Sequence, residues 1–293
     1  MNDPRIKKTN IGYYEVVDKP SQDELNAYYA DKYYQQGIGS YEISYDEEEL
    51  KFIKQKIKQR FYVAEKLTKI TQGNFLDVGC GEGFALKCFS DLGWQVKGVD
   101  FSKAGLEQQN PDMLDNVDVG DIYEILSKYQ ETKKQYDVIW LNNVLEHVLD
   151  PISLLKDLKK LTSRGGVLVV TVPNDGSDLQ EYCFNNNLIP NRFWIALPDH
   201  MSYFSYKSLN SIAKHTDWDC VDVIADFPID FYLLHPGANY VVDKSCGPAA
   251  HRARIQAELL VSDRNIDDVL NYYRAMAKVG LGRDLTAFFL PNI

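Results

Sequence analysis

The stretch that most constrains the fold is NFLDVGCGEGF at residues 74–84. An apolar run that ends in an acidic residue and passes into a glycine-rich loop predicts a buried strand, a tight turn and then a helix. Gly79, Gly81 and Gly83 allow sharp backbone turns and let a ligand lie against the backbone. Helix-forming residues follow, and Gly93 stands where a helix end favours a left-handed residue.

A second apolar run, VKGVDFS at residues 96–102, predicts the neighbouring strand, which ends on Asp100. A carboxylate at the tip of this strand can accept hydrogen bonds from the two hydroxyls of a ribose. We assign Phe101 and the loop residue Cys80 to the same site. The two runs together therefore predict a site for a nucleoside-containing cofactor.

The glycine spacing indicates which nucleoside cofactor binds. A dinucleotide fold favours G-x-G-x-x-G/A with a small third residue, whereas this loop reads G-x-G-x-G and is followed by Phe84. Asp77 precedes the first glycine, where its charge would repel a pyrophosphate and attract a cationic group. These features weigh against a nicotinamide dinucleotide and make an oxidoreductase the less favoured interpretation.

Later stretches follow in an order that strengthens this interpretation. LDVGCGEG at residues 76–83 closely resembles motif I of the class I S-adenosylmethionine-dependent methyltransferases. Residues 136–151 resemble motif IV of that family, including its Leu-Glu-His-Val signature, and residues 163–174 resemble its fifth strand, with a turn expected at 163–166. The resemblance implies an α/β fold, a doubly wound, seven-stranded, mostly parallel Rossmann-like sheet. It also implies S-adenosylmethionine as methyl donor and S-adenosylhomocysteine as product.

The resemblance also implies roles for individual residues near the cofactor. Asp121 would bind the adenine amino group and Ile122 would pack against the ring. In isolation a simple helix N-cap explains Asp121 equally well, but its place after Asp77 and Asp100 favours the cofactor role. Asn142 and Asn143 follow the fourth strand, and ligands of open α/β sheets lie beyond such carboxyl ends.

Two histidines are candidate catalytic bases. His147 lies in the motif IV loop, and the ordinary pKa of histidine, about 6.5, suits removal of a hydroxyl proton. His200 precedes an aromatic segment that borders the acceptor site in similar enzymes. Glu146 and Tyr203 are candidate acceptor-binding residues. The competing interpretation is that Glu146 and both histidines only hold loops or cap helices.

A metal is not expected. In ubiquinone-biosynthesis O-methyltransferases, a related Glu-x-x-Glu-His arrangement has been associated with a metal. Asn143 stands where the first of those glutamates would be, so one anionic oxygen ligand is missing. We therefore predict that no metal is required.

The rest of the chain is expected to surround this core. An amphipathic helix is predicted at about 47–69, and the tyrosine-rich segment before it includes Tyr33 and Tyr34 as candidate acceptor contacts. We predict an N-terminal helical cap over 1–73 and a methyltransferase core over 74–235. A helical insert over 236–282, which could be a lid or a homodimer contact, precedes the last strand at 283–293.

Composition limits the partners. A net charge of −10 and a pI near 5.0 argue against nucleic acid as a substrate, because phosphate binding needs a basic face. Neither a signal peptide nor an apolar run of membrane length is expected, and five scattered cysteines are typical of a reduced, cytoplasmic protein.

The sequence therefore predicts transfer of a methyl group to a hydroxyl of a small polar metabolite. The overall pattern resembles sugar-modifying methyltransferases of bacterial surface-polysaccharide pathways, which implies a sugar or nucleotide-sugar acceptor. The same residues are also compatible with an N-methyltransferase of an amine or amino sugar, and with a non-catalytic S-adenosylmethionine-binding partner subunit.

Overall fold

The computed structural model describes residues 1–22, 24–25, 27–28 and 44–292, so the predicted contacts of Tyr33 and Tyr34 lie outside the described residues. The main sheet has seven strands in the order β5-β4-β3-β6-β7-β10-β9. Only β10 runs antiparallel to its neighbours, which confirms the predicted fold class. The strands are β3 (Asn74–Val78), β4 (Gln95–Asp100), β5 (Val117–Val119), β6 (Tyr136–Asn142), β7 (Thr162–Pro173), β9 (Trp218–Ala225) and β10 (Asp284–Pro291).

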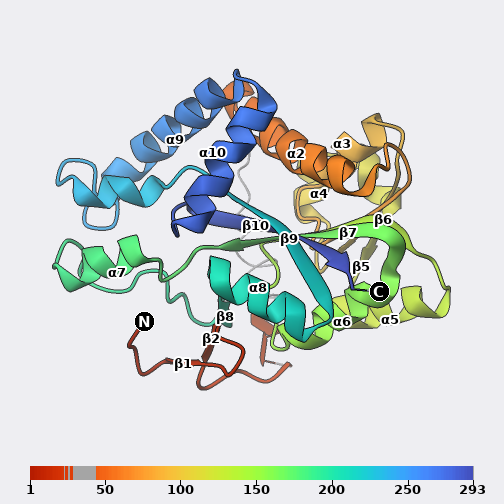
Figure 1. Ribbon diagram of the computed structural model, residues 1–293, viewed down its shortest axis with the longest axis horizontal. Helices are drawn as coiled ribbons and strands as arrows, with labels where there is room; N and C mark the ends of the chain where they lie inside the picture. The colour runs from red at the N-terminus through yellow and green to blue at the C-terminus, as the bar shows by residue number, and fades with distance from the viewer. Residues whose placement is uncertain (23, 26, 29–43, 293) are drawn as a thin grey trace.

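Helices cover both faces of this sheet. As drawn in Figure 1, α2, α9 and α10 lie above the sheet and α6 and α8 lie below it. The helices of the core are α2 (Glu47–Thr68), α3 (Phe84–Asp91), α4 (Ala104–Gln109), α5 (Ile122–Glu131), α6 (Pro151–Leu161) and α8 (Tyr206–His215). The helix predicted at about 47–69 is confirmed, and a capping box between Asp46 and Glu49 fixes its start.

One local prediction is wrong. The turn expected at 163–166 belongs to β7, which begins at Thr162. A register shift between β6 and β7 accommodates Gly165 and Gly166 within the strand. The hydroxyl of Ser163 donates a 2.8 Å hydrogen bond to Asp137, which ties the extra residues to the neighbouring strand.

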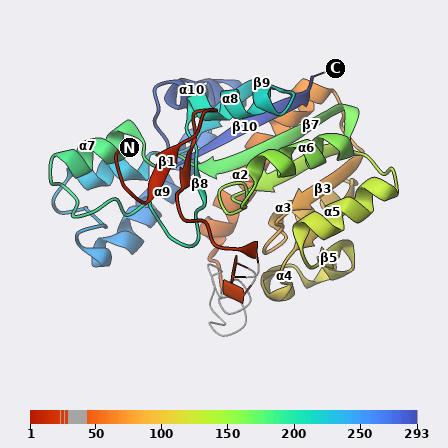
Figure 2. The ribbon, with the colours of Figure 1, turned by 90° about the horizontal axis from the view of Figure 1, so that it is seen from below.

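A helical cap was predicted over 1–73, but the N-terminal segment is only partly helical. β1 (Ile6–Lys8) and β2 (Tyr14–Val16) form a hairpin, and β8 (Ser202–Tyr203) adds to it as a third strand. Figure 2 shows this small sheet beside α7 (Asp178–Asn185). The hairpin therefore braces the segment that carries His200.

The insert before the last strand packs on the N-terminal helix α2. It contains η2 (Ile229–Leu234), η3 (Lys244–Cys246), α9 (Gly247–Ser262) and α10 (Ile266–Lys278). Lys56 of α2 pairs with Glu258 of α9 at 2.7 Å, and the Gln59 amide donates to Ser262 at 3.0 Å. Lys66 reaches Asp267 of α10 at 2.6 Å. These contacts make the insert a wall above the sheet.

Aromatic packing fixes the position of the glycine-rich loop. Phe75 of β3 stacks on Phe89 of α3, with ring centroids 3.7 Å apart, and Trp140 of β6 meets both rings edge-on. All three side chains are buried.

The five cysteines are free. Among the helices in the described ranges, none is long and apolar enough to cross a membrane.

Candidate active site

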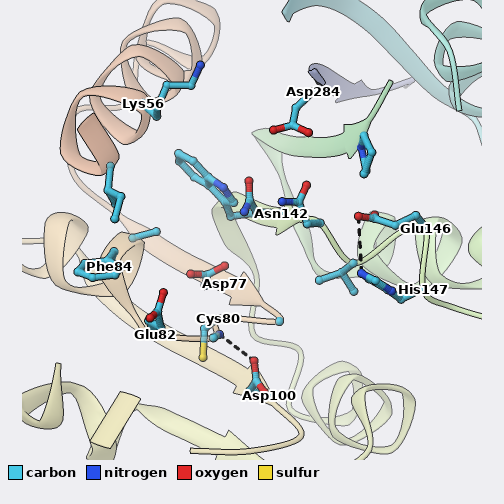
Figure 3. A pocket seen from close by; sticks show the side chains of 18 of the residues that line it. Lys56, Asp77, Cys80, Glu82, Phe84, Asp100, Asn142, Glu146, His147 and Asp284 are labelled. Carbon is cyan, nitrogen blue, oxygen red and sulfur yellow. Dashed lines mark hydrogen bonds and ion pairs between the residues drawn. The ribbon is translucent and has the colours of Figure 1, made fainter. Parts of the chain in front are cut away.

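A cavity of about 1000 Å³ lies where β3, β4 and β6 end, between the glycine-rich loop and helices α2 and α9. This is the upper end of the range for small-molecule sites, so a nucleoside and a small second molecule fit together. Figure 3 shows Asp77 and Asp100 on one side of the cavity and Glu146 and His147 on another. The predicted cofactor residues that line it are Asp77, Gly79, Cys80, Gly81, Gly83, Asp100, Phe101, Ile122, Asn142 and Asn143.

The glycine-rich loop requires its glycines. Gly79 and Gly83 have φ angles of +76° and +75°, in the left-handed region that side chains disfavour. A Cβ on Gly79 would lie 2.3 Å from a methyl group of Val144, and one on Gly83 would lie 2.1 Å from Leu106. The loop therefore passes close to its neighbours and leaves its cavity side open to a ligand.

Two buried carboxyl groups face the cavity from neighbouring strand ends. The amide of Gly81 donates a 2.8 Å hydrogen bond to one oxygen of Asp100, and the amide of Ser102 donates a 3.0 Å hydrogen bond to the other. Burial raises the pKa of Asp100 in spite of these hydrogen bonds. Burial, followed by the charge of Asp100, raises the pKa of Asp77 well above its ordinary value. A ligand that brings hydroxyl donors or a positive charge would stabilise both carboxylates.

The next acidic residue has a structural role. Asp121 caps α5 by accepting a 3.1 Å hydrogen bond from the amide of Glu124. Within the described part of the chain, the cavity wall includes Ile122 and Tyr123 but not Asp121. The N-cap interpretation therefore holds for Asp121 in this structure, and its contact with adenine stays a prediction.

Arg60 is a site residue that the sequence did not reveal. It projects from α2 into the cavity and donates a 2.7 Å hydrogen bond to the Oδ1 atom of Asn142, at the end of β6. This contact is with a neutral amide, and burial lowers the pKa of Arg60. The guanidinium has five N–H donors, so it can bind an anion in the cavity. The sequence offered no signal for this role beyond a basic residue within the predicted amphipathic helix.

The predicted bases His147 and His200 lie together, with ring centroids 5.0 Å apart. The Nδ1 atom of His147 is 2.8 Å from the carbonyl oxygen of Asp199, and its Nε2 atom is 3.7 Å from Glu146. Because a carbonyl oxygen only accepts, Nδ1 of His147 carries the proton. His200 bonds through Nδ1 to the carboxylate of Asp175 at 3.0 Å.

Glu146 is buried beside these histidines. Its side chain is 2% exposed, and neither carboxyl oxygen has a hydrogen-bond partner among the described residues. Burial raises the pKa of Glu146 well above its ordinary value. The Glu146 carbonyl oxygen accepts from the amides of Met201 and Ser202, at 2.7 Å and 3.0 Å, which holds the two histidine loops together. A ligand with hydroxyl or amine groups would supply the missing partners.

The same three residues could hold a metal ion. One ligand atom from each of Glu146, His147 and His200 lies within 4.8 Å of the others. One oxygen and two imidazole nitrogens suit a divalent transition metal. Asn143 lines the cavity at the position where the metal-associated motif has its first glutamate. The site therefore lacks a fourth, anionic ligand at this position.

Tyr203, predicted to bind the acceptor, lies elsewhere. It is buried at 2% exposure in the small core beside β1 and β2, and its hydroxyl donates to the carbonyl oxygen of His200 at 3.1 Å. In the described ranges the cavity wall does not include it. In this structure, Tyr203 therefore holds the His200 loop from behind.

Charged residues from the insert complete the far wall. Arg254 of α9 pairs with Asp226, lies 3.3 Å from Glu258 and 3.7 Å from Asp284, and lines the cavity. Burial and the neighbouring charge of Asp226 raise the pKa of Asp284 to about 6. This network joins α9 to the ends of β9 and β10.

Comparison with known proteins relates this geometry to a family. The model of a family described as a methyltransferase domain matches residues 45–223. The chain is 31% identical over 125 residues to a ubiquinone biosynthesis O-methyltransferase of Vibrio cholerae, covering 42% of this chain and 50% of the relative. It is 32% identical over 107 residues to the protein of that name from Proteus mirabilis, covering 36% and 44%. The chain thus spans about half the length of the curated relatives it matches.

A solved structure shares the fold. The plantazolicin methyltransferase BpumL, in complex with a monoazolic desmethylPZN analog and SAH, aligns with a TM-score of 0.51 and 19% sequence identity. The alignment covers 92% of this chain and 97% of that chain. The similarity therefore extends beyond the family match, into the N-terminal segment and the insert.

Proposed function

The chain belongs to the methyltransferase-domain family, and from this premise we propose that it transfers a methyl group from S-adenosylmethionine to a hydroxyl group of a small polar acceptor. The observation that carries the proposal is the pair of buried carboxyl groups, Asp77 and Asp100, beside the glycine-rich loop in a cavity large enough for two ligands.

The cavity residues suit this methyl donor. Asp100 would accept hydrogen bonds from the ribose hydroxyls, and Asp77 would stabilise the positive charge near the sulfur and amino group. The guanidinium of Arg60 would bind the carboxylate of the methionine part. Ile122, buried in the cavity wall, would pack against the adenine. When bound, S-adenosylmethionine supplies an electrophilic methyl group on a positively charged sulfur.

The acceptor side favours oxygen over nitrogen. The histidine pair offers a base for a hydroxyl proton, and the curated relatives are named O-methyltransferases. Glu146 lies 3.7 Å from Nε2 of His147, and neither of its carboxyl oxygens makes a hydrogen bond among the described residues. This favours an acceptor with a second hydroxyl next to the reacting one, because that group would supply a hydrogen bond to the buried carboxyl. Sugars, nucleotide sugars and dihydroxyphenols share this feature.

The two curated relatives are named for ubiquinone biosynthesis, and neither name refers to a sugar or a polysaccharide, as the resemblance inferred from the sequence had implied. Phe52, Ile53 and Ile57 add an apolar wall on α2 that would also suit an aromatic ring. We therefore rank a dihydroxyphenol first and a sugar second. We propose that the protein works without a required metal, in the cytoplasm, on a small molecule rather than on nucleic acid.

The test is incubation of the full chain with methyl-labelled S-adenosylmethionine and a panel of acceptors, followed by mass spectrometry. The panel pairs each dihydroxy compound with its monohydroxy analogue: catechol with phenol, and a nucleotide sugar with its deoxy form. Label on oxygen of the dihydroxy members is expected. Label on nitrogen of an amine control, or binding of NADH in place of S-adenosylhomocysteine, would overturn the proposal.

A further inference from the structure

Asp175 lies behind His200 and is absent from the motifs of the sequence analysis. It lies two residues after the end of β7, its side chain is 2% exposed, and its two oxygens have different partners. One oxygen is 3.0 Å from Nδ1 of His200, and the other accepts a 2.6 Å hydrogen bond from Arg283. The carboxylate thus bridges a histidine of the cavity wall and a partly buried arginine.

The backbone fixes this bridge. β10 pairs with β7 so that Asp284 stands opposite Pro173, and the amide of Asn174 donates to the carbonyl oxygen of Arg283 at 2.8 Å. This register places Arg283 beside Asp175. Burial alone would raise the pKa of Asp175, but Arg283 and the hydrogen bond with His200 outweigh it and lower the pKa. The group is therefore a carboxylate at neutral pH.

The two histidines differ in what holds them. Nδ1 of His147 faces a neutral carbonyl oxygen, whereas Nδ1 of His200 faces a carboxylate. A carboxylate fixes the Nδ1–H tautomer, leaves Nε2 as the basic nitrogen, and stabilises the imidazolium that forms when Nε2 takes a proton. The methyl transfer needs one base, and His200 is the histidine whose Nδ1 faces a carboxylate.

We propose that His200 is the general base of the methyl transfer and that Asp175, held by Arg283, is its positioning residue. The inference rests on the proposed function. In the step, the acceptor oxygen forms a bond to the methyl carbon while the carbon–sulfur bond breaks and its electron pair goes to sulfur. The hydroxyl proton passes to Nε2 of His200, so a sulfonium, a hydroxyl and a neutral imidazole become a thioether, a methyl ether and an imidazolium.

The kinetic test compares Asp175→Asn with Asp222→Asn in the full chain. Asp222 of β9 accepts several hydrogen bonds from Arg274 of α10. D222N therefore removes a similar carboxylate–guanidinium pair that does not contact a histidine. We expect D175N to lower kcat by about 100-fold, within the range for a lost general base, without changing the Kd of S-adenosylhomocysteine. D222N is expected to keep kcat within about 2-fold. A kcat for D175N within 3-fold of wild type would overturn the proposal.

A second readout does not need turnover. The ¹⁵N spectrum of histidine-labelled protein resolves the five histidines, and His200→Gln assigns the relevant signals. Wild type is expected to show a protonated Nδ1 and an unprotonated Nε2 for His200, and D175N a mixture of tautomers. An Nε2–H tautomer in wild type would refute the proposal. If wild type methylates nothing in the panel, the proposed function fails while this spectrum still decides the inference.

If D175N fails to fold, Arg283→Lys is tested with the same ¹⁵N spectrum and with kcat. A retained Nδ1–H tautomer of His200 together with a kcat lowered several-fold would support the bridge. An unchanged kcat would contradict it.

Discussion

Arg60 on α2 donates a 2.7 Å hydrogen bond to the side-chain oxygen of Asn142 at the end of β6. A helix that lies before the glycine-rich loop in sequence thereby places a guanidinium at the carboxyl end of a central strand. This contact fixes the direction of Arg60 and leaves its other donors for a ligand in the cavity. The N-terminal segment is thus part of the proposed cofactor site and does more than cover it.

Arg60→Met should weaken binding of S-adenosylhomocysteine about 10- to 100-fold, because a hydrogen bond between charged groups contributes about 1.5–3 kcal/mol. Methylthioadenosine has no amino acid part, so its affinity should not change. Calorimetry with both ligands measures the difference. Arg274→Met, which removes an arginine that binds Asp222 on β9, is the control. Equal losses for both ligands would show that Arg60 supports only the fold.

Asp100→Ala should weaken binding of S-adenosylhomocysteine by a similar 10- to 100-fold, since the ribose would lose a charged acceptor. The variant also frees the amides of Gly81 and Ser102, so its thermal midpoint should be measured alongside. The 2′-deoxy form of the ligand separates the two effects. Wild type should prefer the ribose form, and D100A should bind both forms alike. A preference that survives in D100A would contradict the assignment.

Gly79→Ala should destabilise the loop, because the new Cβ meets Val144 at 2.3 Å and an L-residue at φ +76° costs about 1–2 kcal/mol. Loss of S-adenosylhomocysteine binding should accompany a lower thermal midpoint. Gly165→Ala is the matched control, since no heavy atom beyond its chain neighbours lies within 4 Å of its new Cβ. If the two variants melt alike, the loop is less restrained than its backbone angles indicate.

Asp284→Asn tests the charge network by pH. Burial and Asp226 raise the pKa of Asp284 to about 6 from its ordinary 3.8, so the folded protein keeps a proton that the unfolded chain releases. The free energy of unfolding should therefore fall as pH rises through about 4 to 6, and the asparagine variant should escape that fall. Relative to wild type, D284N should gain on the order of 1 kcal/mol between pH 5 and pH 8, because about one unit of the shift in pKa lies above pH 5. Urea denaturation at both pH values measures this, and a constant difference would refute it.

The sequence predicted the parts of the site that depend on neighbours along the chain. The turn at Gly79 and the ends of β3 and β4 follow from local backbone requirements and from strand order, so Asp77 and Asp100 could be assigned correctly to the cavity wall. Arg60 and Asp175 could not be found, because their roles depend on the packing of α2 over β6 and on the register of β10 against β7. The order of motifs does not specify either relationship.

The N-terminal hairpin was missed for a related reason. β1 and β2 are three residues each, and they are stabilised by pairing with β8, which is distant in sequence. Such short strands carry little periodicity of their own. The position of Tyr203 follows from this pairing, because β8 turns its ring into the small core instead of the cavity. Its predicted acceptor contact rested on the aromatic segment after His200, which borders the acceptor site in similar enzymes.

Two of the ion pairs that join α2 to the insert differ in their exposure to solvent. Lys56 and Glu258 form a pair that is only 12% and 2% exposed, whereas Lys66 and Asp267 are each 50% exposed. Removing one partner of a buried pair leaves an uncompensated charge, at about 3–5 kcal/mol, while a surface pair contributes about 0–1 kcal/mol. The buried pair should therefore control how firmly the insert closes the cavity.

Lys56→Met should speed hydrogen exchange in α9 and raise the KM of the acceptor, because α9 forms the far wall of the cavity. Lys66→Met should leave both nearly unchanged. Arg254 remains 3.3 Å from Glu258 in the K56M variant and offsets part of the loss, so a rise in exchange confined to α9 is expected in place of global unfolding. Equal exchange rates in the two variants would mean that apolar packing, and not this ion pair, holds the insert against α2.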